Sequence, residues 1–546
     1  MKKPTLGAKL SEIRRSEEEA RTKELSQKLG LPYLNLFGLP PEPDGLFLIP
    51  EEKARSSKMI VIKKQGKNLE IAASEPKNPE TKKTLEELSR QNYAYHLFLI
   101  SSSSLEDGLA HYKEITLTAA KKTGQVEISS GLISEFREEI KGLENLREKI
   151  SQIPAAKTSE LLEIIISGAL NLDASDIHLE PAEENTSLKY RLDGLLYEVG
   201  VLNNKVFSLI LSRVKLLSNM KLNIKDVAQD GRFTIRLAGK DMEVRSSVIP
   251  GNYGESVVMR LLNPETISLN LDDLGFRQED IALIEKEIKR PNGLIITTGP
   301  TGSGKTTTLY AFFKKITKPE IKIITLEDPI EYHLSGIVQT QVDEKAGYTF
   351  ADGLRSILRQ DPDILLIGEI RDQETCKTAL NASLTGHLVF STLHTNDAAG
   401  AIPRFIDLGA DAGTLAPSLN LIMAQRLVRR LCEKCKTKFK PDAEVLEKIE
   451  KGLKGTKHPP LAKATFYKTK GCDACHGLGY KGRIGILEII PVDQDLEKLI
   501  GKPPTHAEVV EFAAKKGCMN MRQDALLKVL EGITTLEEVE RVISDE

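Results

Sequence analysis

The sequence lacks any long apolar run, and none reaches the roughly 18 residues that a membrane-spanning helix needs. The opening residues, Met1-Lys2-Lys3-Pro4, are followed by charged residues and not by the apolar core of a signal peptide. We therefore expect a cytoplasmic protein. Its contact with a membrane is expected to be only indirect, through partners that recruit it to the inner face of the cytoplasmic membrane.

The chain also lacks a strong net charge and has few cysteines. Its net charge is −2 over 546 residues, which argues against nucleic acid as a partner and against a helicase or a DNA packaging motor. Of the six cysteines, four form two close pairs, which in a cytoplasmic chain favours metal binding over disulfides. A hydrophobic content of 40% allows ample core, and the length predicts about two to four domains.

One motif organises the chain, a glycine-rich loop that ends in Lys-Thr and fits the phosphate-binding loop of a nucleoside triphosphatase. A short apolar strand over 293–298 precedes it and a helix over 306–315 follows, which is the context that the motif requires. The glycines allow a tight turn whose N–H groups face the phosphates, Lys305 is expected on the β/γ-phosphates, and Thr306 on Mg²⁺. The residues predicted to bind nucleotide are Gly299, Pro300, Thr301, Gly302, Ser303, Gly304, Lys305, Thr306 and Thr307.

Two further apolar strands end in carboxylates. The strand over 323–326 leads into the acidic box Glu327–Glu331, which could hold Mg²⁺ through water or orient the attacking water. The strand over 363–367 leads to Gly368-Glu369, where Glu369 is predicted to support Mg²⁺ or the water. We expect both at the edge of a parallel sheet where nucleotides bind.

A further strand, over 385–395, has a histidine near either end. His394 is a candidate sensor of the γ-phosphate, and His387 is a weaker one. Farther along, two Cys-x-x-Cys pairs predict one closed tetrahedral zinc site of the structural type. Its four ligands are Cys432, Cys435, Cys472 and Cys475.

Composition and periodicity divide the chain into five parts. Strand and helix alternation predicts α/β domains, the last of them built on a parallel sheet. The predicted parts are a mobile or loosely docked segment over 1–24, a small docking domain over 25–112, a polar linker with an exposed helix near its end over 113–155, a second α/β domain over 156–263, and the nucleotide-binding domain over 264–546, which holds the paired cysteines in 426–490 and helices in 491–546.

Taken in order, these motifs closely resemble the secretion ATPase family that drives type IV pilus assembly and type II secretion. The resemblance covers nearly the whole chain from about Leu29. Besides the glycine-rich loop and the paired cysteines, it is carried by Ala174–Pro181, Arg191–Gly194, Gln229–Arg232, Gly254-Glu255 with Arg260, Glu327–Glu331, Gly368–Asp372 and the segment around His394.

The resemblance implies a cytoplasmic homohexamer that hydrolyses ATP and acts on an inner-membrane platform protein. Each chain would have an N-terminal docking domain, a PAS-like second domain and a RecA-like ATPase domain, with ATP between the last two. By motif match, Glu331 is the catalytic glutamate and Glu369 the Walker B residue. Arg232, Arg245 and Arg260 are candidates to reach the phosphates from the second domain.

The leading functional hypothesis is an extension motor of type IV pili, and the alternative is the type II secretion ATPase. Retraction motors of the family generally lack the N-terminal domain and the cysteine pairs, which argues against that function. A nucleotide-binding scaffold without turnover is disfavoured because Lys305, Thr306, Glu331 and Glu369 are all present. Some relatives bind cyclic di-GMP through repeated Leu-rich motifs; we do not find that pattern and do not predict such binding.

Overall fold

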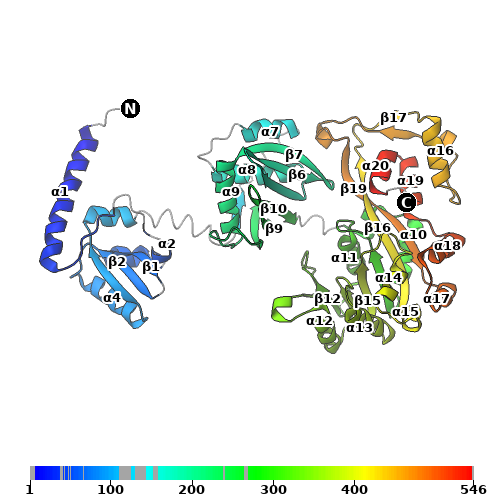
Figure 1. Cartoon of the computed structure of the whole chain (residues 1–546), viewed down its shortest axis with the longest axis horizontal. Coiled ribbons are helices and arrows are strands. Elements are labelled where there is room, and N and C mark those ends of the chain that lie inside the picture. The colour runs from blue at the N-terminus through cyan, green and yellow to red at the C-terminus, as the bar shows by residue number, and fades with distance from the viewer. Residues whose placement is uncertain are drawn as a thin grey trace. The chain divides into compact units, whose positions relative to one another are not determined.

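The computed structural model describes residues 6–36, 41, 43–46, 48–49, 51–65, 67–109, 125–128, 143–151, 158–237, 240–262 and 269–543. The chain divides into two compact units, Met1–Gln125 and Val126–Glu546, and each is described here by itself (Figure 1). In the described residues, no helix is both long enough and apolar enough to cross a membrane.

The first unit contains a small sheet covered by short helices. Its strands lie in the order β1-β2-β3, antiparallel between β1 and β2 and parallel between β2 and β3. The strands β1 and β2 form a hairpin, and the helix after it starts at Pro79, behind an Asn78 side chain that accepts a bond from the Glu80 N–H. The elements are α1 (Leu6–Leu29), α2 (Pro43–Leu46), α3 (Glu51–Ser56), β1 (Met59–Gln65), β2 (Asn68–Ala73), α4 (Pro79–Arg90) and β3 (Ala94–Leu99).

The described part of the N-terminal segment is helical. It belongs to α1, and side-chain bonds tie the C-terminal half of that helix to the small sheet. Glu19 accepts hydrogen bonds from Tyr33 at 2.7 Å, from Ser101 at 2.6 Å and from Ser104 at 2.7 Å. Arg15 forms an ion pair with Asp107. Polar side chains therefore dock a helix that has no apolar stripe, a mode that hydrophobic periodicity does not predict.

The second unit begins with a seven-stranded sheet. The pairings of β8 with β9, β9 with β10, β10 with β5, β5 with β6 and β6 with β7 are all antiparallel. Along β6 the residues alternate between buried and half-buried, as expected for a sheet with one face on a core. The strand order is β4-β8-β9-β10-β5-β6-β7. The elements are β4 (Gln125–Ile128), α7 (Leu143–Ser151), α8 (Thr158–Asn171), β5 (Asp176–Pro181), β6 (Asn185–Leu192), β7 (Leu195–Asn203), α9 (Asn204–Leu217), β8 (Gln229–Leu237), β9 (Lys240–Gly251) and β10 (Gly254–Leu262).

The predicted linker is also more ordered than expected near its end. The helix expected to be exposed over 136–150 is described only from Leu143, as α7, and residues 129–142 lie outside the described part. Leu146 and Ile150 are buried in the core of the second domain, so α7 packs on that domain. Their four-residue spacing forms an apolar stripe, which the many charged residues between them obscure in the sequence.

The rest of the second unit is built on another seven-stranded sheet, in the order β13-β12-β14-β15-β11-β16-β19. All neighbours are parallel except β19, which runs antiparallel to β16. Its strands are β11 (Gly293–Thr298), β12 (Ile323–Glu327), β13 (Val338–Gln341), β14 (Ile364–Ile367), β15 (Leu388–Leu393), β16 (Leu419–Leu431) and β19 (Tyr480–Pro491).

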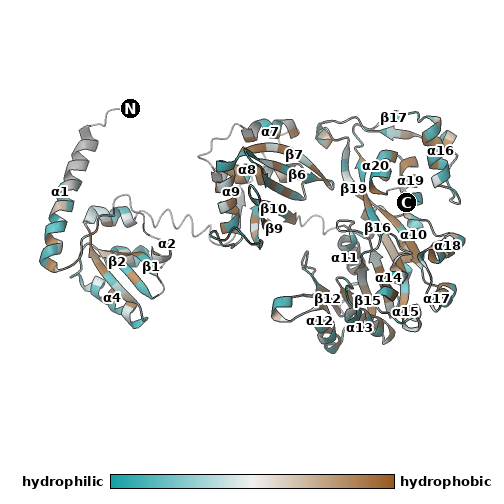
Figure 2. Cartoon of the chain, in the orientation of Figure 1, coloured by the Kyte–Doolittle hydropathy of each residue, from teal (hydrophilic) through white to brown (hydrophobic). Residues whose placement is uncertain are grey.

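This sheet is covered on both faces. In β11, Leu294 and Ile296 join one hydrophobic cluster while Ile295 joins another, so the strand is buried on both sides. Figure 2 shows hydrophobic residues concentrated on such strands. The mixed α/β fold predicted from the sequence is confirmed. The covering helices are α10 (Gln278–Glu287), α11 (Lys305–Ile316), α12 (Phe350–Ile357), α13 (Gln373–Leu384), α14 (Ala401–Asp407) and α15 (Ala412–Ser418).

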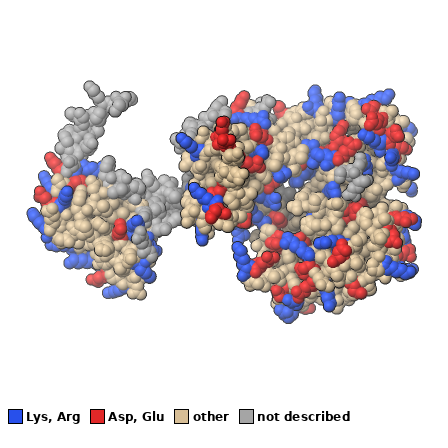
Figure 3. Space-filling model, viewed as in Figure 1, with Lys and Arg blue, Asp and Glu red and all other residues tan. Residues whose placement is uncertain are grey.

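Between β16 and β19 the chain leaves the sheet and makes a small insert. The insert contains α16 (Ala443–Gly452) and a two-stranded ladder of β17 (Thr437–Phe439) and β18 (Phe466–Lys468). Both signs of charge are spread over the visible face of the molecule (Figure 3). The last helices are α17 (Gln494–Ile500), α18 (His506–Lys515), α19 (Met521–Leu530) and α20 (Leu536–Val542).

Candidate functional site

The glycine-rich loop connects β11 to α11 and has the backbone shape of a phosphate-binding turn. Gly299, Gly302 and Gly304 have φ angles of 142°, 80° and 89°, which side-chain-bearing residues rarely adopt. Space demands glycine as well, because a Cβ at Gly299 would lie 2.4 Å from the carbonyl oxygen of Gln425. The Gln425 side chain, on β16, also accepts a hydrogen bond from Thr308 at 2.8 Å, so this buried amide holds the first turn of α11 against β16, directly after the loop.

Two polar groups of the loop fit an anion. The Lys305 Nζ donates to the carbonyl oxygens of Gly299 and Pro300, at 2.6 and 3.1 Å, and so lies folded over the loop. Burial lowers the pKa of Lys305, and the charge of Glu369 opposes that shift. The Ser303 Oγ is buried with no hydrogen-bond partner among the described residues. A cationic amine and an orphaned hydroxyl beside the N–H groups of the loop fit a phosphate chain.

The acidic box follows β12, and its two end carboxylates differ in environment. Glu327 is buried and accepts bonds from Tyr310, from Thr325 at 2.6 Å and from Gln339 at 3.1 Å. Its oxygens are therefore engaged within the protein. Glu331 is more accessible, with 29% of its side chain exposed. Of the two, Glu331 is the one available to a reactant.

Glu369 lies just past β14, and His394 just past β15, the neighbouring parallel strand. The His394 Nε2 is 3.1 Å from a Glu369 oxygen, and Arg371 pairs with the other oxygen. The hydrogen bond to Glu369 raises the pKa of Arg371 against the opposing effect of burial. The structure thus brings Glu369, His394 and the phosphate-binding loop to the carboxyl edge of one sheet.

His387 lies elsewhere. It precedes β15 at the amino edge of the sheet, and its Nδ1 is 3.0 Å from the carbonyl oxygen of Ala382 near the end of α13. We assign His387 a structural role, because its ring caps the C-terminal end of α13.

The three candidate arginines of the second domain form a row. Arg232 on β8 is the direct cross-strand partner of Arg245 on β9, and Arg245 is the direct partner of Arg260 on β10. Direct partners point to the same face of a sheet, with Cβ atoms about 4.5–5.5 Å apart. The row continues through Asp176 on β5 to Arg191 on β6.

A row of like charges is unfavourable unless anions lie between them. Asp176 supplies one, at 2.9 Å from the Nε of Arg260 and 3.5 Å from that of Arg191. Glu331 supplies another, at 3.2 Å from the Nη1 of Arg245. Arg232 is exposed and has no ion-pair partner among the described residues. The row therefore has room for one more anion next to the acidic box.

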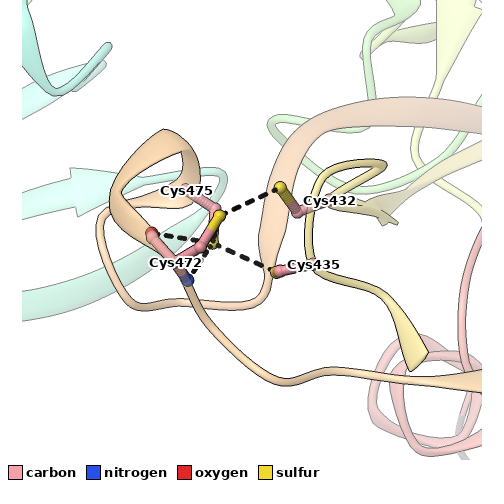
Figure 4. Close-up of side chains that lie close together, drawn as sticks. All are labelled: Cys432, Cys435, Cys472 and Cys475. Atoms are coloured by element: carbon pink, nitrogen blue, oxygen red, sulfur yellow. Dashed lines mark hydrogen bonds between the residues drawn. The ribbon is translucent and has the colours of Figure 1, made fainter.

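The four paired cysteines come together in one cluster (Figure 4). Sulfur–sulfur distances are 3.8 Å for Cys432–Cys472, 3.7 Å for Cys435–Cys475 and 3.8 Å for Cys472–Cys475. Four ligands at the zinc–sulfur bond length of about 2.3 Å in a tetrahedron would be about 3.8 Å apart. The cluster therefore fits a tetrahedral metal.

The surroundings of the cysteines support the same reading. Backbone N–H groups of Cys472 and Gly479 donate to the Cys475 sulfur, both at 3.2 Å. Burial acts against ionisation of Cys472, but backbone hydrogen bonds from Cys475 and Ala474 outweigh it and lower its pKa to about 7. Burial raises the pKa of Cys435 to about 12, so four thiolates require a cation among them.

Several residues that shape this site could not be predicted from the sequence. Asp176 lies inside one of the motifs named above, but nothing in the sequence links it to Arg260, 84 positions later. Arg371 lies only two residues after Glu369, and its pairing with that carboxylate depends on the shape of the turn after β14. Gln425 and Tyr310 lie in ordinary strand and helix patterns, and no signal could have identified them.

Comparisons with known proteins agree with this geometry. The family model described as type II/IV secretion system protein matches residues 152–541, and the MshEN domain model matches residues 29–119. The second match places the N-terminal region in a domain family without naming a ligand, so our expectation about cyclic di-GMP stays untested.

Two relatives cover much of the chain. The type IV pilus assembly ATPase PilB of Myxococcus xanthus is 38% identical over 98% of this chain and 93% of its own. The type II secretion system protein E of Pseudomonas aeruginosa is 42% identical over 76% of this chain and 80% of its own.

Among solved structures, the Legionella pneumophila ATPase DotB superposes with a TM-score of 0.52 at 20% identity. The match covers 70% of this chain and 95% of DotB, and it supports the fold alone. The family model and the long relatives, in contrast, extend over the loop, the acidic box, the arginine row and the cysteine pairs. This chain belongs to the type II/IV secretion system protein family and to its ATPases.

Proposed function

We propose that this chain is the ATP-hydrolysing motor of a type IV pilus assembly machine. It works as a cytoplasmic homohexamer at the inner face of the cytoplasmic membrane and drives an inner-membrane platform protein, without nucleic acid as a partner. The observation that carries the proposal is the arginine row, because a second domain that offers arginines to the acidic box can couple hydrolysis to domain movement. The near full-length likeness to a pilus assembly ATPase supports the choice of machine.

The loop binds the phosphates of ATP. Its N–H groups and the N-terminus of α11 face the phosphate chain, Ser303 donates its free hydroxyl, and Lys305 exchanges its loop carbonyls for the β/γ-phosphates. Thr306 and Glu369 would hold Mg²⁺, which neutralises phosphate charge when bound. Thr307 adds a hydroxyl at the same helix end.

Glu331 orients the attacking water as the catalytic glutamate. The buried bonds of Glu327 fix the start of the acidic box, so the Glu331 carboxylate is delivered from a rigid strand end. Glu369, held between Arg371 and His394, supports the opposite side of the γ-phosphate. His394 senses that phosphate through its contact with Glu369.

The arginine row couples chemistry to movement. Arg245 pairs with Glu331, yet a phosphate is a competing anion for the same guanidinium. Transfer of Arg245 to the phosphate frees Glu331 for water, and Arg232 and Arg260 add charge beside it. An arginine that stabilises this transition state is typically worth about 10³–10⁵ in rate. The second domain closes over ATP and opens again after hydrolysis. This movement is the mechanical step of the motor.

The cysteine cluster binds Zn²⁺ in a structural role. All four ligand positions are filled by cysteines, so the site has no open position for a substrate. The four cysteines would hold the metal so that the two ends of the insert, at Cys435 and Cys472, stay together. The metal would then stabilise the insert and take no part in hydrolysis.

The test measures ATP hydrolysis against protein concentration, with mass followed by light scattering. We expect activity to rise as hexamers form and to vanish in Lys305→Ala, which keeps the fold. Equal activity in a stable monomer would overturn the ring motor. A hexamer that binds ATP without turnover would point to the scaffold function.

The type II secretion ATPase is the second candidate, favoured by the 42% identity to a secretion protein over 414 residues. The chemistry would be the same and the machine different. Deletion of the gene should remove surface pili and leave secreted hydrolases at normal levels. Loss of secretion with pili intact would identify the secretion machine.

A further inference from the structure

The second domain contacts the ATPase domain at a further place, away from the pair of Arg245 and Glu331. Asp193 lies in the turn between β6 and β7, and its Oδ2 accepts a hydrogen bond of 2.9 Å from the N–H of Gly482, on β19. The Nε of Arg483 lies 4.0 Å from the other carboxylate oxygen. A side chain of the second domain is thus bonded to the backbone of the ATPase sheet, 289 positions later in the chain.

The turn that carries Asp193 has a defined backbone shape. Asp193 and Gly194 have φ angles of 46° and 90°, as in the tight hairpin turn that favours Asp-Gly. Burial raises the pKa of Asp193, and the hydrogen bond from Gly482 and the charge of Arg483 act against that rise. A carboxylate that is partly withdrawn from water depends on its remaining donors, so the bond from Gly482 fixes the turn on β19.

A neighbouring contact joins the same edge of the second domain to β16. The hydroxyl of Tyr197, on β7, accepts a hydrogen bond of 3.2 Å from the Nη1 of Arg429. The buried Glu538 binds the Nε and Nη2 of the same arginine, at 3.0 and 2.7 Å, and the Tyr480 ring lies 4.0 Å from the guanidinium carbon. Arg429 is therefore fixed within the ATPase domain and directs its remaining nitrogen to the second domain. Leu478 adds an apolar contact with the core of that domain.

The two places of contact differ in their response to a phosphate. Arg245 can exchange Glu331 for a phosphate, because both are anions. At the other place, the second domain is bound through a backbone N–H and a neutral hydroxyl, and Arg429 already has a buried carboxylate as its partner. A phosphate has no anion to replace there. One contact can change its partner while the other keeps it, which is the arrangement of a hinge.

The strand order sets the distance between the two places. Strands β9 and β6 are separated by β10 and β5, so three strand spacings, or about 14 Å, lie between Arg245 and the strand that leads to Asp193. With an arm of this length, a rotation of about 10° around the turn moves Arg245 by about 2.5 Å. This is close to the length of a hydrogen bond, so a small rotation is enough to change the partner of Arg245.

We propose that the contact of Asp193 and Tyr197 with β19 and β16 is the pivot about which the second domain closes, and that both are positioning residues for Arg245. The pivot keeps its partners while Arg245 moves between Glu331 and the phosphate. The inference rests on the proposed function, because it explains how that arginine reaches the nucleotide. Asp193 and Tyr197 act through Arg245 and not on the reacting atoms.

The test is a double-mutant cycle on kcat, measured with the full chain. Asp193→Ala removes the acceptor for Gly482 and should lower kcat about 10- to 100-fold with KM within a few-fold, because a misplacement of about 1 Å has effects of this size. In an Arg245→Ala background the same change should lower kcat less than about twofold, since no arginine is left to position.

Two further variants separate the hydrogen bonds from general effects on folding. Asp193→Asn keeps an acceptor oxygen and tolerates the left-handed backbone, so it should retain most of the activity. Tyr197→Phe removes the hydroxyl but keeps the ring, and it should lower kcat in the same cycle by a smaller factor. If Asp193→Ala does not fold, the cycle with Tyr197→Phe decides the outcome.

Asp173→Ala is the matched control. Asp173 is an exposed aspartate of the same domain with a φ of 54°, so its replacement has the same backbone consequence at a different turn. We expect an unchanged kcat. Losses from Asp193→Ala that are equal with and without Arg245, or unchanged kcat in both Asp193→Ala and Tyr197→Phe, would overturn the pivot and leave the motor function standing. Unchanged kcat in Arg245→Ala alone would instead overturn the coupling role of the arginine row, and the pivot with it.

Discussion

The Nη1 of Arg245, in the second domain, lies 3.2 Å from a carboxylate oxygen of Glu331, at the end of the acidic box. Arg245 also donates to the carbonyl oxygen of Ile330, so the guanidinium engages both the side chain and the backbone of this turn. Residues 86 positions apart thus meet across two domains. An arginine of the second domain therefore forms an ion pair with the candidate catalytic carboxylate.

Arg245→Ala should lower kcat far more than it weakens ATP binding. The arginine acts on charge that develops in the transition state, and a loss of about 10³-fold or more is expected. Arg232→Ala should show the same pattern. Arg236→Ala is the matched control, because Arg236 lies on β8 like Arg232 but pairs with Asp241, at 2.9 Å. Steady-state kinetics with nucleotide titration separates the two effects; unchanged kcat in both row variants would return these arginines to an ordinary surface role.

Glu331→Gln and Glu369→Gln should each retain ATP binding and lose hydrolysis. The amide keeps the shape of the side chain but cannot orient or activate water as a carboxylate does. A fluorescent ATP analogue reports binding, and phosphate release reports turnover. Normal turnover in both variants would remove the assignment of the site.

Glu327→Gln should behave differently from Glu331→Gln. Glu327 is buried and accepts from three side chains, so the neutral amide weakens bonds made to a charged acceptor and replaces one acceptor oxygen with a donor, which destabilises the box by about 1–3 kcal/mol. We expect faster hydrogen exchange in β12 together with a partial loss of activity. Exchange at the unchanged rate would contradict the buried role.

Metal analysis should find about one zinc per chain, because four thiolates fill one tetrahedral site. Cys435→Ser should lose the metal and loosen the insert, seen as faster hydrogen exchange over β17 and β18. Cys376→Ser is the control, since Cys376 is buried away from the cluster. Folded, zinc-free protein with a rigid insert would contradict the site.

Lys215→Met should destabilise the second domain by about 3–5 kcal/mol, because it leaves Glu255 buried without its partner at 2.6 Å. Lys215→Met with Glu255→Leu should recover much of that loss, since an apolar pair of similar volume is often neutral. Hydrogen exchange of β9 and β10 measures both. Equal destabilisation in the single and the double variant would show that the ion pair itself is not the cause.

Local patterns were enough to locate the glycine-rich loop, the strands β11, β12, β14 and β15 of the parallel sheet and the four cysteines that cluster, but they did not indicate β13 or β16. The strand over 293–298 occurs as predicted, since a fully buried parallel strand reads as a short apolar run between glycine-rich turns. The helix α7 was wrongly predicted to be exposed. Its Leu146 and Ile150 are covered by side chains distant in sequence, although most residues around them are polar.

What the sequence by itself determined is the chemistry, because the loop glycines, Lys305 and the cysteine pairs act over a few residues at spacings that backbone geometry dictates. Only the tertiary structure decided which charges meet. Positions 232, 245 and 260 form one row because the register of three strands aligns them, and a slip of one residue would turn each arginine to the other face. Register and domain contact depend on the packing of the whole core, which no local pattern specifies.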